Sequence, residues 1–379
     1  MSIDPSIMFA LLATLAVTGL LIPALKVPAH RLKLIDKPCH RKRHFKPTPL
    51  TGGLALCCGF MIGLLIIPFD WSSYWTLLTG MGILLLLGVL DDYADISATL
   101  RLLVQMAVAS IMVFGGGLDV HILGAPFGDQ IGPVGLGPFS ALFTIVCVVF
   151  MINAINMADG LDGLAGGMVL VMLGLLALTG LLDDAPFDLI ALCLLLAMAT
   201  LGFLIHNMRT PFQQRARAFL GDSGSMALGY AVAWLAVSLG TREGGNVDPI
   251  VMAWILIVPA MDTLALFFRR IRIGRNPLSP DRTHMHHILL RCGYSVPRVV
   301  HTMHLLVLAA GLFGLYGWVS DRPEWQSFAL AAAVLLGYMA LLGKASKILR
   351  WHQKRTTEQT PSDSSHTTNW PVAGKESNG

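Results

Sequence analysis

A stretch of fifteen residues between two apolar runs concentrates side chains that bind cations. It reads Asn153-Ala-Ile-Asn156-Met-Ala-Asp159-Gly-Leu-Asp162-Gly-Leu-Ala-Gly-Gly. Carboxylate and amide oxygens are hard ligands of the kind that Mg²⁺ requires, and glycines let a ligand approach the backbone closely. The stretch therefore predicts a cation together with an anionic ligand, at the edge of a membrane.

Further carboxylates stand at the ends of other apolar runs. Asp91 and Asp92 follow the third run, Asp222 opens the eighth, and Asp262 lies inside the ninth. A single carboxylate in such a place commonly caps a helix, and Asp222 suits a cap especially well. Several together cost free energy unless a cation or basic group neutralises them, so the whole set favours a Mg²⁺ site. Asp262 could equally bind a ligand or pair with an arginine.

The composition requires a membrane around these residues. Of the 379 residues 54% are hydrophobic and only 13% are charged, against roughly 25% charged in a typical soluble domain. We therefore expect an all-α, polytopic integral membrane protein with about eleven spans, each long enough to cross a bilayer. The expected spans are 8–26, 52–69, 73–90, 98–117, 137–155, 164–182, 189–206, 219–239, 249–268, 300–319 and 326–343.

The distribution of basic residues orients these spans. All but two of the 27 Lys and Arg residues lie in or beside the connections on one side, and only Arg242 and Arg322 lie on the other. The positive-inside rule makes the basic side cytoplasmic, with the N-terminus outside and the C-terminus inside. The site carboxylates fall at this cytoplasmic boundary. The pair Asp183-Asp184 falls on the opposite side, where we expect a solvated turn.

The domain organisation is simple. We expect one multi-helix membrane domain over 1–343 and a cytoplasmic tail over 344–379, where a composition rich in Ser, Thr, Gln and Lys predicts disorder.

Two basic loops on the cytoplasmic side could contact an anion. The loop from Lys37 to Lys46, which leads to Gly52-Gly53, favours a topology signal that attracts anionic lipid, with a phosphate cradle as the alternative. The loop that begins at Arg269 carries four arginines and then Arg282-Thr-His284-Met-His286-His287. Arginine binds phosphate oxygens through two donors at once, so this loop predicts an arm that closes over an anion. Its histidines leave a Zn²⁺ site as an alternative, although an oxygen-rich site prefers Mg²⁺.

Taken in order, these motifs resemble those of one family, the polyprenyl-phosphate N-acetylhexosamine-1-phosphate transferases. The likeness covers about residues 30 to 300. The histidine motif is similar to that of the bacterial branch that uses UDP-N-acetylglucosamine and starts O-antigen and enterobacterial common antigen, in lipopolysaccharide and cell-envelope synthesis. The motifs are Lys37-Pro to Gly52-Gly53, Asp91-Asp92, Asn153-x-x-Asn156-x-x-Asp159-Gly-x-Asp162-Gly, Phe-x-Gly-Asp222-x-Gly-Ser and Arg282-x-His284-x-His286-His287.

The resemblance implies transfer of a sugar 1-phosphate from a UDP-sugar to undecaprenyl phosphate, with release of UMP, in the bacterial inner membrane. It implies Mg²⁺ or Mn²⁺ as the cofactor. By the same resemblance Asp222 and Asn156 are metal ligands, and the catalytic residues are Asp91, Asp92, Asp159 and Asp162, the last two orienting the nucleotide sugar. His284 and His286 would hold the diphosphate. We further expect four residues to contact substrate, namely Asn153, Asp262, Arg282 and His287.

Several alternatives stay open at this point. The donor could be another UDP-N-acetylhexosamine or UDP-MurNAc-pentapeptide, and Asp91 and Asp92 could act as a base or as positioning groups. The alternative from another functional class is a secondary transporter or lipid flippase. Transporter sites lie near the bilayer midplane, whereas the carboxylates here collect at one face. No feature predicts a nucleic-acid partner, and a homodimer is left open.

Overall fold

The computed structural model describes residues 5–36, 47–274 and 283–359, with side chains described up to 343. The described chain is nearly all helical, and its two strands, β1 (Ile35–Asp36) and β2 (Thr48–Pro49), form a short antiparallel pair. The helices are α1 (Pro5–Ala24), α2 (Lys26–Arg31), α3 (Gly52–Ile66), α4 (Trp75–Ala94), α5 (Ala98–Ser110), η1 (Ile111–Gly115), η2 (Gly137–Phe139), α6 (Ser140–Ala158), α7 (Leu164–Leu182), α8 (Phe187–Asn207), α9 (Gly221–Gly240), α10 (Pro249–Arg272), α11 (Met285–Arg291), α12 (Val296–Val319) and α13 (Glu324–Gln359).

The structure confirms an all-α, multi-pass membrane protein. Within the described residues, ten helices are long and apolar enough to cross a bilayer. The expected span over 52–69 corresponds to α3, which has only 15 residues and packs against α1, α8 and α9. Large apolar side chains such as Leu20 and Phe114 stand exposed on the outside of the bundle, as contact with lipid requires.

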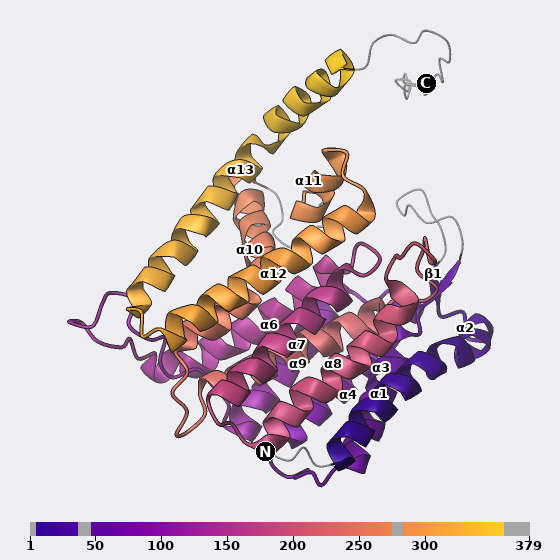
Figure 1. Ribbon diagram of the computed structural model, residues 1–379, viewed down its shortest axis with the longest axis horizontal. Coiled ribbons are helices and arrows are strands. Elements are labelled where there is room, and N and C mark those ends of the chain that lie inside the picture. Colours follow the sequence, from indigo (N-terminus) through magenta and orange to yellow (C-terminus); the bar gives the residue numbers. More distant parts are fainter. Residues whose placement is uncertain (1–4, 37–46, 275–282, 360–379) are drawn as a thin grey trace.

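Alternating helix ends gather at two faces of the bundle, and one of them collects the site residues. We call this the acidic face. It holds the ends of α4, α6, α8 and α10 and the starts of α3, α7 and α9. Gly52 N donates to Phe219 O at 3.0 Å, and Gly163 N donates to Asn207 Oδ1 at 2.7 Å, so its connections are bonded to one another. The start of α1 and the end of α13 lie at opposite ends of the bundle (Figure 1).

The opposite face corrects one expectation. Asp183 lies in a turn, but its side chain is buried and pairs with Arg242, with Nη2 2.6 Å from Oδ2. It also accepts a hydrogen bond from Asn246 N at 2.9 Å. The ion pair between Asp183 and Arg242 therefore joins two loops, so the Asp183 side chain is not solvated as expected.

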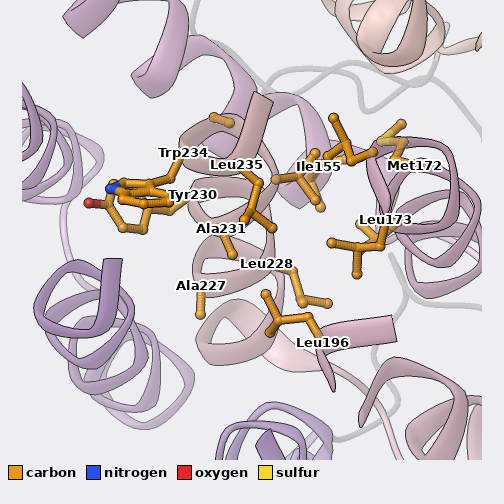
Figure 2. Close-up of a cluster of buried hydrophobic side chains, with 14 of the residues drawn as sticks. Ile155, Met172, Leu173, Leu196, Ala227, Leu228, Tyr230, Ala231, Trp234 and Leu235 are labelled. Atoms are coloured by element: carbon orange, nitrogen blue, oxygen red, sulfur yellow. The ribbon is translucent and has the colours of Figure 1, made fainter. Parts of the chain in front are cut away.

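Helix α9 is the centre of the bundle. In the most apolar stretch of α9, 83% of the residues are buried, against 11% in that of α13 at the periphery. Tyr230 and Trp234 point from α9 to one side, and Leu228 points to the other, toward Leu196 of α8 (Figure 2). The Tyr230 hydroxyl donates to Thr76 O at 2.9 Å and Trp234 Nε1 donates to Thr76 Oγ1 at 3.0 Å, because polar atoms in an apolar interior need partners.

Glycines bring the helices that carry the carboxylates into backbone contact. A Cβ placed on Gly88 of α4 would lie 2.2 Å from Ser223 Cα of α9, and one on Gly53 of α3 would lie 2.4 Å from Gly224 N. Small residues allow such close helix packing in membranes, where the hydrophobic effect does not drive helices together. The close approach at Gly88 sets Asp91 and Asp92 beside the start of α9.

The last helix extends beyond the expected domain boundary. Helix α13 begins at Glu324 and continues through 344–359, where we expected a disordered tail to start. Residues 360–379 of that tail lie outside the described residues.

Replacement of Gly88 by alanine should destabilise the protein and disturb the α4–α9 contact. Because the added methyl group would meet the Ser223 backbone, we expect the free energy of unfolding to fall by about 1–3 kcal/mol, the usual cost of overpacking. Gly82→Ala is the matched control, since nothing lies within 4 Å of its added Cβ on the same helix. Thermal unfolding in detergent measures both, and equal melting temperatures would contradict the packing described.

Candidate active site

Asp92 caps the first turn of α9 from the neighbouring helix. Its Oδ1 accepts a hydrogen bond from Asp222 N at 3.0 Å, and its Oδ2 accepts one from Ser223 N at 3.4 Å. The first amides of a helix have no partner within the helix, and the positive end of its dipole favours a carboxylate. Gly221, at φ +74°, turns the chain into α9 beside this carboxylate. Helix capping was the alternative role for Asp222, but Asp92 fills it.

Asp91 is held by an arginine that the motifs did not include. The Asp91 side chain is buried; its Oδ2 lies 2.5 Å from Arg101 Nη1 and its Oδ1 accepts from Ile96 N at 2.7 Å. Ser97 caps α5 by accepting from Leu100 N, which places Arg101 in the first turn of that helix. The same Nη1 lies 4.0 Å from Asp222 Oδ2. One guanidinium group therefore faces two carboxylates.

Asn156 and Asp222, the two expected metal ligands, lie side by side. Asn156 Nδ2 donates to Asp222 Oδ1 at 2.6 Å and to Ser225 Oγ at 2.8 Å. Both amide hydrogens are thus used, which leaves Asn156 Oδ1 as the atom that could bind a cation. Both side chains are partly exposed at the acidic face.

Asp159 follows the last turn of α6 and lies within the influence of the other carboxylates. Burial, and then the charges of Asp222, Asp92 and Asp162, raise the pKa of Asp159 to about 7. A carboxyl group with this pKa is only partly ionised at neutral pH, because further negative charge is unfavourable there. We call Asp91, Asp92, Asp159, Asp162 and Asp222 the acidic cluster.

Asp162 anchors the connection between α8 and α9. Its Oδ2 accepts from Arg209 Nε at 2.7 Å and from Ala216 N at 3.2 Å. The start of α7 is fixed to the same connection by the bond between Gly163 and Asn207. Asp162 is therefore committed to protein contacts, unlike Asp159.

We call the segment 282–287 the histidine arm. Its described part lies over the glycine-rich turn that follows Asp159. The His284 and His286 rings are stacked, with centroids 5.6 Å apart, and the His286 and His287 rings are 4.2 Å apart. His286 Nε2 is buried without a hydrogen-bond partner among the described residues. It lies 3.0 Å from the position that a Cβ atom added to Gly160 would occupy. Burial, and then the two neighbouring imidazoles, lower the pKa of His286 to about 3, so the ring is neutral at pH 7.

Some expected site residues lie elsewhere. Asn153 donates to Gln105 Oε1 at 2.6 Å, a contact between α6 and α5. Gly166 packs against Phe203 and Leu204, so it serves helix packing. Arg282 and the basic loop 37–46 lie outside the described residues.

Comparison with known proteins decides the family. Residues 74–240 match the sequence model of glycosyl transferase family 4. A Yersinia pestis protein named undecaprenyl-phosphate alpha-N-acetylglucosaminyl 1-phosphate transferase is 32% identical over 327 residues, which cover 85% of this chain and 88% of the relative. This chain belongs to glycosyl transferase family 4. Proteins of the same name from Escherichia coli O157:H7 and Haemophilus influenzae are 33% and 29% identical, over 85% of this chain and 87% and 90% of their own lengths.

The family assignment confirms the resemblance seen in the motifs. The matched segment of glycosyl transferase family 4 contains the whole acidic cluster, from Asp91 to Asp222, and ends before the histidine arm. The acidic cluster is thus the part of the site that the family match covers directly.

Sequence reasoning missed three polar residues of this family 4 site. Arg101 and Arg209 were counted only as topology signals, yet each pairs with a carboxylate of the acidic cluster. His304, in α12, lies with Nε2 3.1 Å from Gly163 O. An ionisable residue inside an apolar span is a functional candidate by default, and that signal could have identified His304.

The donor set suits a divalent cation that also binds substrate. Within the described part of the chain, no three or more His, Cys, Asp or Glu residues form a group that could hold a metal by themselves. Mg²⁺ usually takes one or two carboxylates, waters and substrate phosphates instead of a closed protein cage. Burial, and then the charges of Asp222, Asp92 and Asp162, raise the pKa of Asp159, so a cation beside these carboxylates would be favourable. Asp222 with Asn156 therefore fits Mg²⁺ or Mn²⁺.

Because His286 is buried in its neutral form, we expect the folded protein to lose stability in acid. Because the pKa of His286 in the folded protein is about 3, below its ordinary value of 6.5, the unfolded state binds the proton first and stability declines as the pH falls below about 6.5. We expect the melting temperature of His286→Gln to fall less steeply between pH 7 and pH 5 than that of the wild type. His121→Gln, whose ring is exposed on the opposite face, is the control. Parallel curves for wild type and His286→Gln would contradict a buried neutral ring.

Proposed function

We propose that this protein transfers N-acetylglucosamine 1-phosphate from UDP-N-acetylglucosamine to undecaprenyl phosphate and releases UMP. One observation carries the proposal: a buried imidazole nitrogen on His286, without a hydrogen-bond partner among the described residues, faces Gly160, the residue after Asp159 of the acidic cluster. A diphosphate with its cation would satisfy both groups. The names of the relatives supply the transferred group, N-acetylglucosaminyl 1-phosphate, and the acceptor, undecaprenyl phosphate.

The location of the reaction follows from charge. The acidic face is the side on which nearly all Lys and Arg residues lie, so we assign it to the cytoplasm of a bacterial inner membrane, where nucleotide sugars are made. The lipid acceptor reaches the same boundary from within the bilayer. Its product would start an O-antigen, common-antigen or related polysaccharide.

In the proposed reaction an oxygen of the lipid phosphate attacks the β-phosphorus of the donor. The bond between that phosphorus and the bridging oxygen breaks, and UMP leaves with the bridging oxygen and its electron pair. Phosphoryl transfer needs in-line positioning and neutralised charge more than covalent help from the protein. The acceptor phosphate has a second pKa near 6, so it is mostly a dianion in water at pH 7.

The contacts support a separate role for each carboxylate. Asp222 and Asn156 would hold the divalent cation, which would supply charge neutralisation at the diphosphate. Asp91 accepts from Arg101 and Ile96, and Asp92 accepts from the amides of Asp222 and Ser223 in the first turn of α9, so both would act as positioning groups. Asp159, with a pKa of about 7, is the carboxylate left to orient the donor or accept a proton.

An assay with purified protein tests the proposed reaction. We expect UMP and lipid-linked N-acetylglucosamine when the protein is incubated with labelled UDP-N-acetylglucosamine, undecaprenyl phosphate and Mg²⁺. UDP-N-acetylgalactosamine and UDP-MurNAc-pentapeptide are tested in parallel. A preference for either of these would replace the donor within the same chemistry. Absence of product with all three donors would overturn the proposal.

Asp222→Asn tests the cation site. The substitution keeps the shape of the side chain but removes the charge, so we expect the maximal rate to fall by about 10² or more and the Mg²⁺ concentration at half-maximal rate to rise. Asp188→Asn is the control, because Asp188 lies on the opposite face and accepts only a 3.4 Å bond from Asp70 N in the described structure. Initial rates across a Mg²⁺ titration measure both quantities. An unchanged rate and Mg²⁺ response would refute the ligand assignment.

A further inference from the structure

Asp262 has no free role as a substrate ligand, because three donors from other elements converge on its carboxylate. It lies in the apolar helix α10 and is 6% exposed. Oδ1 accepts from the Tyr338 hydroxyl of α13 at 2.5 Å and from Met285 N of α11 at 2.9 Å. Oδ2 lies 2.9 Å from His284 Nδ1. Pairing with an arginine was the alternative to ligand binding for Asp262, but its partner in the structure is the histidine arm.

These bonds determine how the imidazole of His284 is presented. A carboxylate accepts only from a protonated ring nitrogen, so Nδ1 of His284 carries the proton and donates to Asp262. The other nitrogen, Nε2, is then left for a different partner. Buried carboxylates commonly orient ligand-binding imidazoles in this way in metal sites.

The orientation of His284 is passed on to the acidic cluster by stacking. The His284 and His286 rings are 12° from parallel, and His286 Nε2 faces Gly160. A shift of the His284 ring would displace His286 from the turn that carries Asp159. Asp262 thus acts on the site through two stacked rings.

Helix α13 supplies the outermost part of this arrangement. It is the least buried of the candidate spans, yet its inner side packs at this point: Leu342 forms a small buried cluster with Ala265 and Leu266 of α10. Tyr338 lies beside that cluster. Its hydroxyl is therefore placed by apolar packing to bond to Asp262.

We propose that Asp262 and Tyr338 are positioning residues, which hold the stacked His284–His286 pair at the place where the diphosphate of the donor binds. The identity of that ligand rests on the proposed function, whereas the arrangement of the four side chains does not. Neither Asp262 nor Tyr338 touches substrate. Helix α13, which lies beyond the segment matched to the family, becomes a support of the active site.

Tyr338→Phe is the mildest test, since it removes one hydroxyl and keeps the packing. We expect the KM for UDP-N-acetylglucosamine to rise about five- to tenfold, the effect of losing one ordinary hydrogen bond, because Tyr338 acts on the ligand only indirectly, with the KM for undecaprenyl phosphate unchanged. Tyr316→Phe is the matched control, because Tyr316 is exposed on α12 near the opposite face. Equal KM values for wild type and Tyr338→Phe would overturn the proposal.

A double-mutant cycle distinguishes action through His284 from direct contact. If Asp262 acts through His284, the effects of Asp262→Asn and His284→Gln on kcat/KM will be strongly non-additive, and the double variant will be about as impaired as the worse single one. Additive effects would show that Asp262 acts independently and would overturn the positioning role. If Asp262→Asn does not fold, the Tyr338→Phe result alone decides.

A chemical measurement tests the arrangement without any activity. Diethyl pyrocarbonate modifies accessible, unprotonated imidazoles, and mass spectrometry of the peptide that contains His284 and His286 gives the rate at each ring. We expect at least threefold faster modification of His284 in Tyr338→Phe than in the wild type or Tyr316→Phe, at equal melting temperature. An unchanged rate would overturn the proposal. If the wild type transfers none of the three sugars, the proposed function fails while this measurement still decides the positioning role.

Discussion

The contact between α4 and α9 is the constraint on which the site depends. Gly88 lets the two backbones meet at Ser223, and Asp92 then reaches the free amides at the start of α9. This interaction gives the partly buried carboxylate of Asp92 two donors and the positive end of a helix dipole, which offsets part of its loss of hydration. It also brings Asp222 next to Asp91, so like charges are gathered as a consequence of the same contact.

The remaining elements offset or use that concentration of charge. Arg101 neutralises Asp91 and stands 4.0 Å from Asp222, while Arg209 pairs with Asp162 on the other side. Asp159 receives no such partner in the described structure, and burial together with the charges of its neighbours raises its pKa. A cation bound beside these carboxylates would be favourable, in agreement with the proposed transfer between two anionic substrates. The partners of the cluster come from α5 and from the connection before α9, which explains why these segments lie close to the acidic face.

The sequence could predict the fold class and the membership of the site but not its internal contacts. Apolar length and the distribution of Lys and Arg gave the spans and placed Asp91, Asp222 and Asp159 on one face, because those are properties of the chain itself. The roles within the cluster depend on distances across helices. Asp92, and not Asp222, caps α9 because the backbone contact at Gly88 brings the end of α4 within hydrogen-bond distance of the α9 amides. Tyr338 lies in a span far from the motifs, and its position in the sequence does not predict its bond to Asp262.

The state of the histidine arm changes how charge must be balanced during transfer. The histidines were expected to hold the diphosphate, and burial lowers the pKa of His286 to about 3, so this ring is neutral at pH 7 before a ligand binds. A neutral imidazole can donate or accept a hydrogen bond but supplies no countercharge. Under the proposed function, positive charge would come from a divalent cation held by Asp222 and Asn156. His286 would help to place the diphosphate, and it lies against Gly160, next to Asp159 of the acidic cluster.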